Sequence, residues 1–224
     1  MEPMQGDDEG GAAAPDWAAA TEAKVLEAAL ALAPQRGWTW TMAYAAAASA
    51  GLSPGEAELL LPQGPRDLAA LWSRHCDAAA LASLAAVDPG ALKVRERIRR
   101  ACLARVEAAM TCEAATRRWT GFLALPANLT LGLGLLWESA DGLWRWAGDR
   151  ATDENHYSKR AILAEVLAGV VLVRLAAGEA AALRRLDRRI AQVMAFERFK
   201  ARLKLGDLGH GAAAALGRVR YALG

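Results

Sequence analysis

The sequence is poor in the residues that build disulfide frameworks, metal sites and β-sheets. It holds 3 cysteines and 3 histidines among 224 residues, and neither type recurs at the spacing of metal ligands or of a redox pair. Cys76, Cys102 and Cys112 are therefore predicted to be packed thiols in a reducing compartment. β-Branched residues are sparse and alanine is abundant, which predicts an all-α fold.

Signatures of catalysis are missing as well. The histidines, His75, His156 and His210, lie far apart, and the sequence has no P-loop, GxGxxG or GxSxG motif. We therefore expect no catalytic residues, no metal and no cofactor, so that the protein is not an enzyme. A net charge of +2 gives no general attraction to nucleic acid.

Targeting and membrane-spanning segments are not expected either. The first residues carry four carboxylates and no arginine, unlike a mitochondrial transit peptide, and lack the apolar core of a secretory signal. The apolar stretch 161–177 is interrupted by Glu165 and Arg174, so it is no clean span. We expect a cytoplasmic protein of bacterial origin.

Helical periodicity divides the chain into segments separated by turn residues. Gly37, Gly51, Gly148 and Gly178 are expected just past helix ends, where a left-handed residue is favoured. The expected helices are Trp17–Gln35, Trp40–Ala50, Pro54–Leu60, Pro65–Ala86, Ala91–Met110, Thr111–Leu123, Pro126–Ala147, Asp153–Ala177, Glu179–Lys204 and Leu208–Leu223.

Two of these helices are apolar on more than one side. The segment 126–147 concentrates three tryptophans among leucines, and 161–175 is apolar on both faces with small residues between. Such helices either fill a core or line an apolar cavity. If they line a cavity, the residues expected to contact its apolar ligand are Leu133, Leu136, Trp137, Leu163, Leu167, Val170 and Val171.

Basic residues gather in three places. The run 93–100 keeps apolar spacing at Val94 and Ile98, which predicts the solvated face of a packed helix. Arginines at 184–189 are expected to pair with Glu179 and Asp187. Four cations at 198–204 precede an amphipathic segment that predicts either an interfacial membrane helix or a helix packed on its own domain or a dimer mate; its apolar residues include Leu208, Leu216, Val219 and Leu223.

The first helices resemble the helix-turn-helix of TetR-type regulators. The resemblance rests on the alanine-rich second helix, the turn at Gly51 and the Ser53-Pro54 start of the third helix. This third helix offers Glu56 and Glu58 where a DNA-recognition helix needs cations or amides. We therefore predict a degenerate helix-turn-helix that binds no nucleic acid.

A second resemblance is carried by residues 125–160, which contain in order LPxN, LL, DGLW, AGD and TDxNxYxKR. This segment is similar to the lipid-binding accessory protein family of ubiquinone (coenzyme Q) biosynthesis. That family commonly has a tryptophan where this chain has His156, before Tyr157. The matching residues are Leu125, Pro126, Asn128, Leu135, Leu136, Asp141, Trp144, Ala147, Gly148, Asp149, Thr152, Asp153, Asn155, Tyr157, Lys159 and Arg160.

The resemblance implies a TetR-like bundle with a disordered tail at 1–15, a degenerate helix-turn-helix at 16–64, a lipid-binding region at 65–204 and an amphipathic helix at 205–224. It implies a peripheral protein of the bacterial inner membrane that presents an isoprenoid quinone precursor, or another lipid such as a phospholipid, to a di-iron hydroxylase. The hydroxylase-binding residues implied are Leu131, Leu135, Asp141 and Trp144. By analogy with TetR-like folds we also expect a homodimer formed through the last two long helices. A TetR-type regulator with a hydrophobic effector and a lipid-acting enzyme remain alternative functions.

Overall fold

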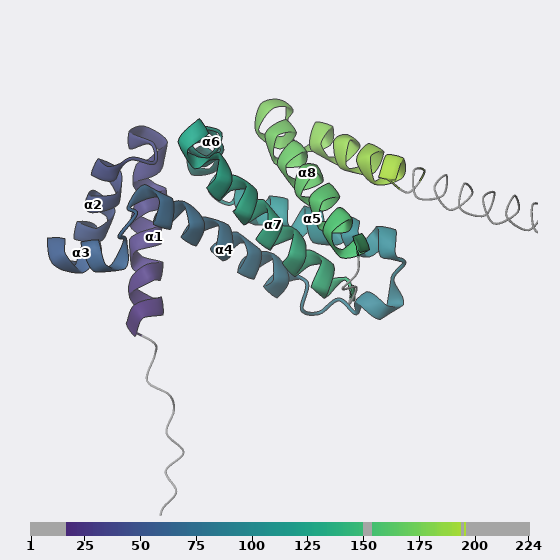
Figure 1. The fold of residues 1–224 in the computed structure, drawn as a ribbon, viewed down its shortest axis with the longest axis horizontal. Coiled ribbons are helices and arrows are strands. Elements are labelled where there is room, and N and C mark those ends of the chain that lie inside the picture. Colours follow the sequence, from purple (N-terminus) through teal and green to yellow (C-terminus); the bar gives the residue numbers. More distant parts are fainter. Residues whose placement is uncertain (1–16, 150–153, 194, 196–224) are drawn as a thin grey trace, which may run out of the picture.

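The computed structural model describes residues 17–149, 154–193 and 195, and all regular structure in these ranges is helical (Figure 1). The prediction of an all-α fold is therefore confirmed. The helices are α1 (Trp17–Arg36), α2 (Trp40–Ser49), α3 (Pro54–Leu60), α4 (Pro65–Ser83), α5 (Val94–Met110), α6 (Glu113–Leu123), α7 (Leu129–Trp146), α8 (Glu154–Ala177) and a further helix at 179–193, with 3₁₀ turns η1 (Pro89–Ala91) and η2 (Pro126–Asn128).

Local chemistry at the helix ends explains where the helices begin and stop. The Ser53 side chain accepts a hydrogen bond from the Glu56 amide while the Glu56 carboxylate accepts one from the Ser53 amide, which makes a capping box at the start of α3. Gly37, Gly51 and Gly148 follow helix ends with positive φ, as expected.

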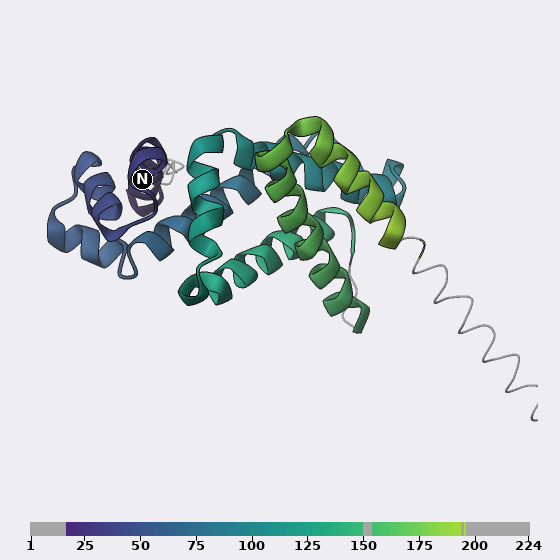
Figure 2. The ribbon, with the colours of Figure 1, turned by 90° about the horizontal axis from the view of Figure 1, so that it is seen from above.

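The α1–α3 unit lies at one end of an elongated molecule, and α4 leads from it toward the other end (Figures 1 and 2). The first hydrophobic core joins α1 and α2 to α4, α6 and the first half of α7, so it extends across residue 64. Trp72 on α4 and Trp119 on α6 are buried in it, and both indole N–H groups donate hydrogen bonds within the core. This core fixes α6, which forms one wall of the candidate site.

A second core occupies the other end of the molecule. It joins the end of α4 to α5, the second half of α7, α8 and the helix at 179–193. Because α7 contributes Leu135 to the first core and Leu143 to the second, it is the helix that couples the two halves. Cys102 lies in the second core and Cys76 in the first, whereas Cys112 is only half-buried.

The structure differs from the expected helices in three places. α4 ends at Ser83, η1 precedes α5, and Pro126 opens a 3₁₀ turn before α7 rather than α7 itself. Such short turns leave no periodic signal in the sequence. The expected tail at 1–15 and the membrane-binding residues Leu208, Leu216, Val219 and Leu223 lie outside the described residues, as does Thr152.

The expected partners of the 184–189 arginines are wrong for the ion pairs that the described residues form. Arg185 and Arg189 both pair with Glu165 on α8, and Asp187 pairs with Arg99 on α5. Glu179 takes no part in a described ion pair. The pairs join neighbouring helices instead of successive turns of one helix, because the helix at 179–193 folds back against α8 and α5.

No described helix is by itself long and apolar enough to cross a bilayer. By length and composition alone, Glu113–Leu123 together with Pro126–Trp146 meets that criterion across a bend of 93°.

Gly64 is predicted to be indispensable to the α1–α3 unit. It has φ of 54° and ψ of −111°, and an added Cβ would lie 2.4 Å from Cζ3 of Trp40. Gly64→Ala should lower the free energy of unfolding by about 1–3 kcal/mol, because alanine would be strained at this positive φ and its Cβ would collide with the Trp40 ring. Urea unfolding followed by tryptophan fluorescence measures the loss. Gly55→Ala is the control, since no atom lies within 4 Å of its added Cβ, and an equal loss in both variants would contradict the prediction.

Candidate functional site

An apolar groove lies between α6, α7 and α8, with a volume of 260 Å³. Two of its lining residues, Gly132 on α7 and Ala168 on α8, are small and fill little of the groove. Gly132 also lets α7 pack close to α6, because an added Cβ would lie 3.3 Å from Cβ of Leu123. The lining residues are Arg105, Trp119, Thr120, Leu123, Ala124, Leu129, Gly132, Leu133, Leu136, Ser139, Leu167, Ala168, Val171 and Leu172.

The mouth of the groove is unusually apolar. Leu129, Leu133 and Leu172 are 51%, 60% and 56% exposed, and all three line the groove. Large apolar side chains that gather around an apolar opening and remain in water mark a site for a ligand or a partner. The groove is therefore suited to an apolar ligand that is only partly enclosed.

A buried polar cluster borders this apolar space. Arg105 is 5% exposed and pairs through Nε with Asp77 on α4, while its Nη2 donates to Oγ of Ser73 at 3.2 Å. Ser139 on α7 donates to the second oxygen of Asp77 at 3.0 Å. Nη1 of Arg105 makes no hydrogen bond within the described part of the chain, so it is the donor that a polar ligand group could meet.

The groove contains four of the seven residues expected to contact lipid, namely Leu133, Leu136, Leu167 and Val171. The other three lie elsewhere. Leu163 borders a smaller pocket against α5, Val170 is buried in the second core, and Trp137 stacks on Tyr157 with ring centroids 6.1 Å apart.

Sequence reasoning missed the α6 wall and the polar cluster. Trp119 and Leu123 lie four residues apart on one buried face of α6, a signal that was available but does not say which helix faces them. Arg105 falls on the buried face of α5 between Cys102 and Val106. A cation at a core position of a helix indicates a buried partner, and this signal could have found it.

The second feature of the site is the junction that binds the end of α7 to the start of α8. Its centre is Arg160, which is 2% exposed. Arg160 donates to Asp141 at 2.5 Å, to Asp149 at 3.2 Å and to the carbonyl of His156 at 3.1 Å. The other oxygen of Asp141 pairs with Arg145 at 2.7 Å. A buried guanidinium is thus neutralised by two carboxylates from the preceding helix and its loop.

Lys159 extends the junction to Trp144. Its Nζ lies 2.7 Å from Asp149 and 5.4 Å from the centroid of the Trp144 ring, and its backbone carbonyl accepts a hydrogen bond from the Trp144 indole at 3.1 Å. Burial raises the pKa of Asp149, but hydrogen bonds from Lys159 and Arg160 outweigh it and hold the pKa below its usual value. The carboxylate is therefore a fixed charge rather than a proton donor at neutral pH.

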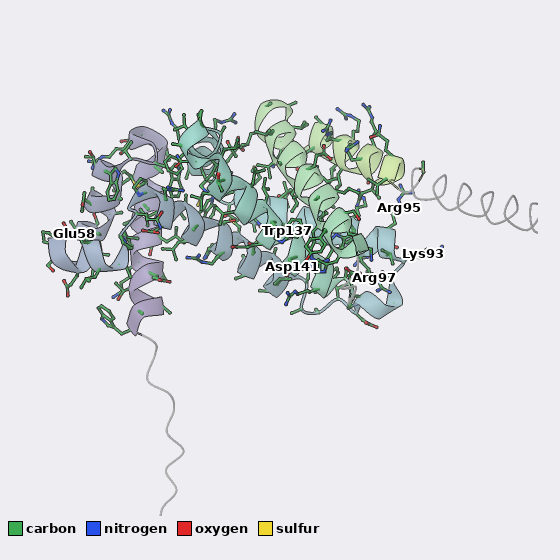
Figure 3. All side chains as sticks on the ribbon, in the orientation of Figure 1. Glu58, Lys93, Arg95, Arg97, Trp137 and Asp141 are labelled. Atoms are coloured by element: carbon green, nitrogen blue, oxygen red, sulfur yellow. The ribbon has the colours of Figure 1, made fainter. Side chains whose placement is uncertain are left out.

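The four residues implied to bind a hydroxylase do not form one exposed patch. Leu135 is 4% exposed and belongs to the first core, whereas Leu131 is half-buried against it. Asp141 and Trp144 belong to the junction (Figure 3 labels Asp141 beside Trp137). A substitution at any of these positions therefore affects packing as well as any contact with a partner.

Two other expectations concern nucleic acid and metal. Glu56 and Glu58 on α3 are exposed, and Glu58 lies at the outer end of the α1–α3 unit (Figure 3). The segment 38–61 contains no lysine, arginine or histidine, which is unfavourable for contact with phosphates. Within the described ranges, no three His, Cys, Asp or Glu side chains come together as metal ligands.

The junction should show its charges in the pH dependence of stability. Because the pKa of Asp149 is lower in the folded than in the unfolded protein, its contribution is complete above the unfolded value near pH 4 and is lost as the pH falls through the folded value. Asp149→Asn should lower the free energy of unfolding by about 2–3 kcal/mol at neutral pH. The variant should also lose less stability than the wild type as the pH falls below about 4. Chemical unfolding at a series of pH values measures both effects.

Asp187→Asn is the matched control for this prediction. Asp187 also has a lowered pKa, held there first by its hydrogen bond from Arg99, but both side chains of this pair are more than a third exposed. Its removal should cost less than about 1 kcal/mol. Equal effects of the two substitutions would show that the junction does not hold α7 to α8.

Comparison with known proteins finds the segment that contains this junction. The COQ9 family model matches residues 129–197, which begin at the first residue of α7. The mitochondrial ubiquinone biosynthesis protein COQ9 of Homo sapiens is 30% identical over 159 residues, covering 68% of this chain and 50% of the human protein.

Other relatives agree. COQ9 of Rattus norvegicus is 29% identical over 161 residues, which are 68% of this chain and 51% of the rat protein, and COQ9-A of Xenopus laevis is 40% identical over 55 residues, which are 25% and 17%. The chain thus spans about half the length of the first two relatives. The family model and the relatives bear out the resemblance seen in residues 125–160, and the chain belongs to the COQ9 family.

Proposed function

We propose that this protein is a non-catalytic accessory protein of ubiquinone biosynthesis that binds an isoprenoid quinone precursor and presents it to a di-iron hydroxylase at the membrane. Family membership supports the pathway, because the relatives are named ubiquinone biosynthesis proteins. The observation that carries lipid binding is the groove between α6, α7 and α8, whose mouth exposes three leucines.

The chemistry of the groove fits a molecule with an apolar tail and a polar ring. The leucines and valines of α7 and α8 offer contacts to an isoprenoid chain, while Arg105 supplies an unengaged Nη1 beside Ser139 at the polar border. A quinone or phenol oxygen accepts such a hydrogen bond, and a phospholipid ester carbonyl does so as well. A hydrogen-bond donor at the border of an apolar groove favours ligands that place an oxygen there.

The groove encloses its proposed ligand only in part, and this supports presentation of the ligand to an enzyme. A volume of 260 Å³ lies just below the roughly 300–1,000 Å³ that encloses a drug-sized ligand, so an isoprenoid tail extends past the mouth. The helix α7 forms both a groove wall and the junction at Trp144. This arrangement supports the proposal, because a hydroxylase that docks on α7 would be next to the groove. Location on the inner membrane and dimerisation through the last long helices remain predictions.

The groove can be tested by charging its mouth. Leu133→Asp and Leu172→Asp should each reduce the amount of isoprenoid that co-purifies with the protein by about tenfold, since each removes roughly 1.5 kcal/mol of apolar contact. Native mass spectrometry of protein purified from a ubiquinone-making host measures occupancy. Melting temperature should stay close to that of the wild type, because both leucines are exposed.

Leu59→Asp provides the control, because Leu59 on α3 is 85% exposed and lies in the α1–α3 unit, away from the groove. It should leave occupancy unchanged. A wild-type protein that remains empty when offered quinone precursors would refute lipid binding. Loss of lipid in all three variants would assign the effect to charge rather than to the groove.

A further inference from the structure

The basic run at the start of α5 is the part of the surface that the proposed function leaves unexplained. Lys93, Val94 and Arg95 are all exposed, with Val94 50% exposed between the two cations. Figure 3 shows Lys93 and Arg95 at the end of the molecule opposite the α1–α3 unit, which carries Glu58. Packing of the hydrophobic core does not explain why a half-exposed valine lies between two exposed cations.

The neighbouring cations of this run are already used within the protein. Arg97 donates to the carbonyls of Leu92 and Ala147 at 2.8 and 2.9 Å, and Arg99 pairs with Asp187 at 2.6 Å. By contrast, the side chains of Lys93 and Arg95 form no hydrogen bond or ion pair within the described part of the chain. Arg95 lies near enough to Asp187 to help lower its pKa, but neither cation is held by a direct bond there, so both can meet an external anion.

Helix stability does not account for these two cations. The first turn of a helix carries the positive end of its dipole, where lysine and arginine are unfavourable and carboxylates are preferred. Lys93 is the N-cap residue of α5 and makes no side-chain capping bond, and Arg95 lies in the first turn. The unfavourable placement points to a role outside the helix.

The described chain also finishes at this end of the molecule. Ile190 and Val193, near the end of the helix at 179–193, line the same pocket of 70 Å³ as Val94 and Arg95. Residues 196–224 continue from there and carry the four cations at 198–204 and the apolar residues expected to form an interfacial helix. Residues 196–224 lie outside the described residues, but the helix that precedes them in the sequence comes close to the cations at the start of α5.

The opposite end has the reverse character. The segment 38–61 has no cation and exposes Glu56 and Glu58. An anionic surface therefore attracts one end of the molecule and not the other, and electrostatic attraction of this kind sets orientation as well as affinity.

We propose that the start of α5, through Lys93, Val94 and Arg95, docks on the anionic phospholipid headgroups of a bilayer, with the α1–α3 unit directed away from the membrane. This inference rests on the membrane location in the proposed function and specifies the face that makes the contact. The two cations meet lipid phosphates, and Val94 contacts the region below the headgroups. The contact uses none of the residues that line the groove, although Trp144 and Lys159 of the junction border the same small pocket as Val94 and Arg95.

The test compares two charge-reversed proteins of equal net charge in the full-length chain. Lys93→Glu/Arg95→Glu alters the proposed face, and Lys24→Glu/Arg36→Glu alters two exposed residues of α1 in the opposite unit. Binding is measured by co-sedimentation with vesicles of phosphatidylcholine alone or mixed equally with phosphatidylglycerol. A basic residue near an anionic surface contributes about a fivefold factor, so the α5 variant should bind the mixed vesicles about 25-fold more weakly.

The control variant should bind within about twofold of the wild type, and neither variant should differ from it on phosphatidylcholine alone. Equal losses in the two variants would reduce the effect to net charge, and no loss in the α5 variant would overturn the proposal. Both variants should keep their co-purifying isoprenoid. An empty wild-type protein would refute the proposed function instead, whatever the vesicles show.

Discussion

The buried charge of Arg160 is the constraint on which the second half of the structure depends. A guanidinium that is 2% exposed is stable only if carboxylates approach it closely, and Asp141 and Asp149 reach it from the end of α7 and the loop that follows. This requirement fixes the position of α8 against α7. Because Leu133 and Leu136 project from α7 while Leu167 and Val171 project from α8, the same ion pairs determine how far apart the walls of the groove stand.

This dependence changes the meaning of the family motif. Several of its residues, among them Asp141, Trp144, Asp149, Lys159 and Arg160, are members of the junction. None of these residues lines the groove. Trp144 and Lys159 line a separate, smaller pocket. The signature that makes the chain recognisable therefore specifies how two helices are joined. In the proposed function, the ligand is selected by the less distinctive leucines, valines and alanines of the groove, which the junction positions.

The sequence predicted local features well because their causes are local. Helix periodicity, the Ser53-Pro54 start of α3 and the glycines with positive φ at 37, 51 and 148 depend on a few neighbouring residues. Four of the seven residues predicted to contact lipid line the groove, and their contact with a lipid stays a prediction. Leu163 and Val170 lie outside the groove; both faces of α8 are apolar, so periodicity cannot choose which side lines it.

Contacts between distant segments could not be predicted. Arg99 and Asp187 are 88 residues apart, and the partner of Arg105 is Asp77 on another helix. Nothing in the local pattern around either arginine names its carboxylate. The α6 wall of the groove was missed for the same reason: Trp119 has the period of a core residue, and only the turn through η2 brings α6 against α7.

Incomplete enclosure connects the groove to the basic end of the molecule. A ligand that filled 260 Å³ and left its tail outside would expose apolar surface to water, at a cost of about 25 cal/mol per Å². That cost disappears if the exposed tail stays in a bilayer while its ring enters the groove. A protein that binds in this way has to remain at the membrane surface in a defined orientation, and a charged end that opposes an uncharged or acidic end provides one. If the protein acts as proposed, the open groove and the uneven charge together allow it to handle a lipid that never fully leaves its membrane.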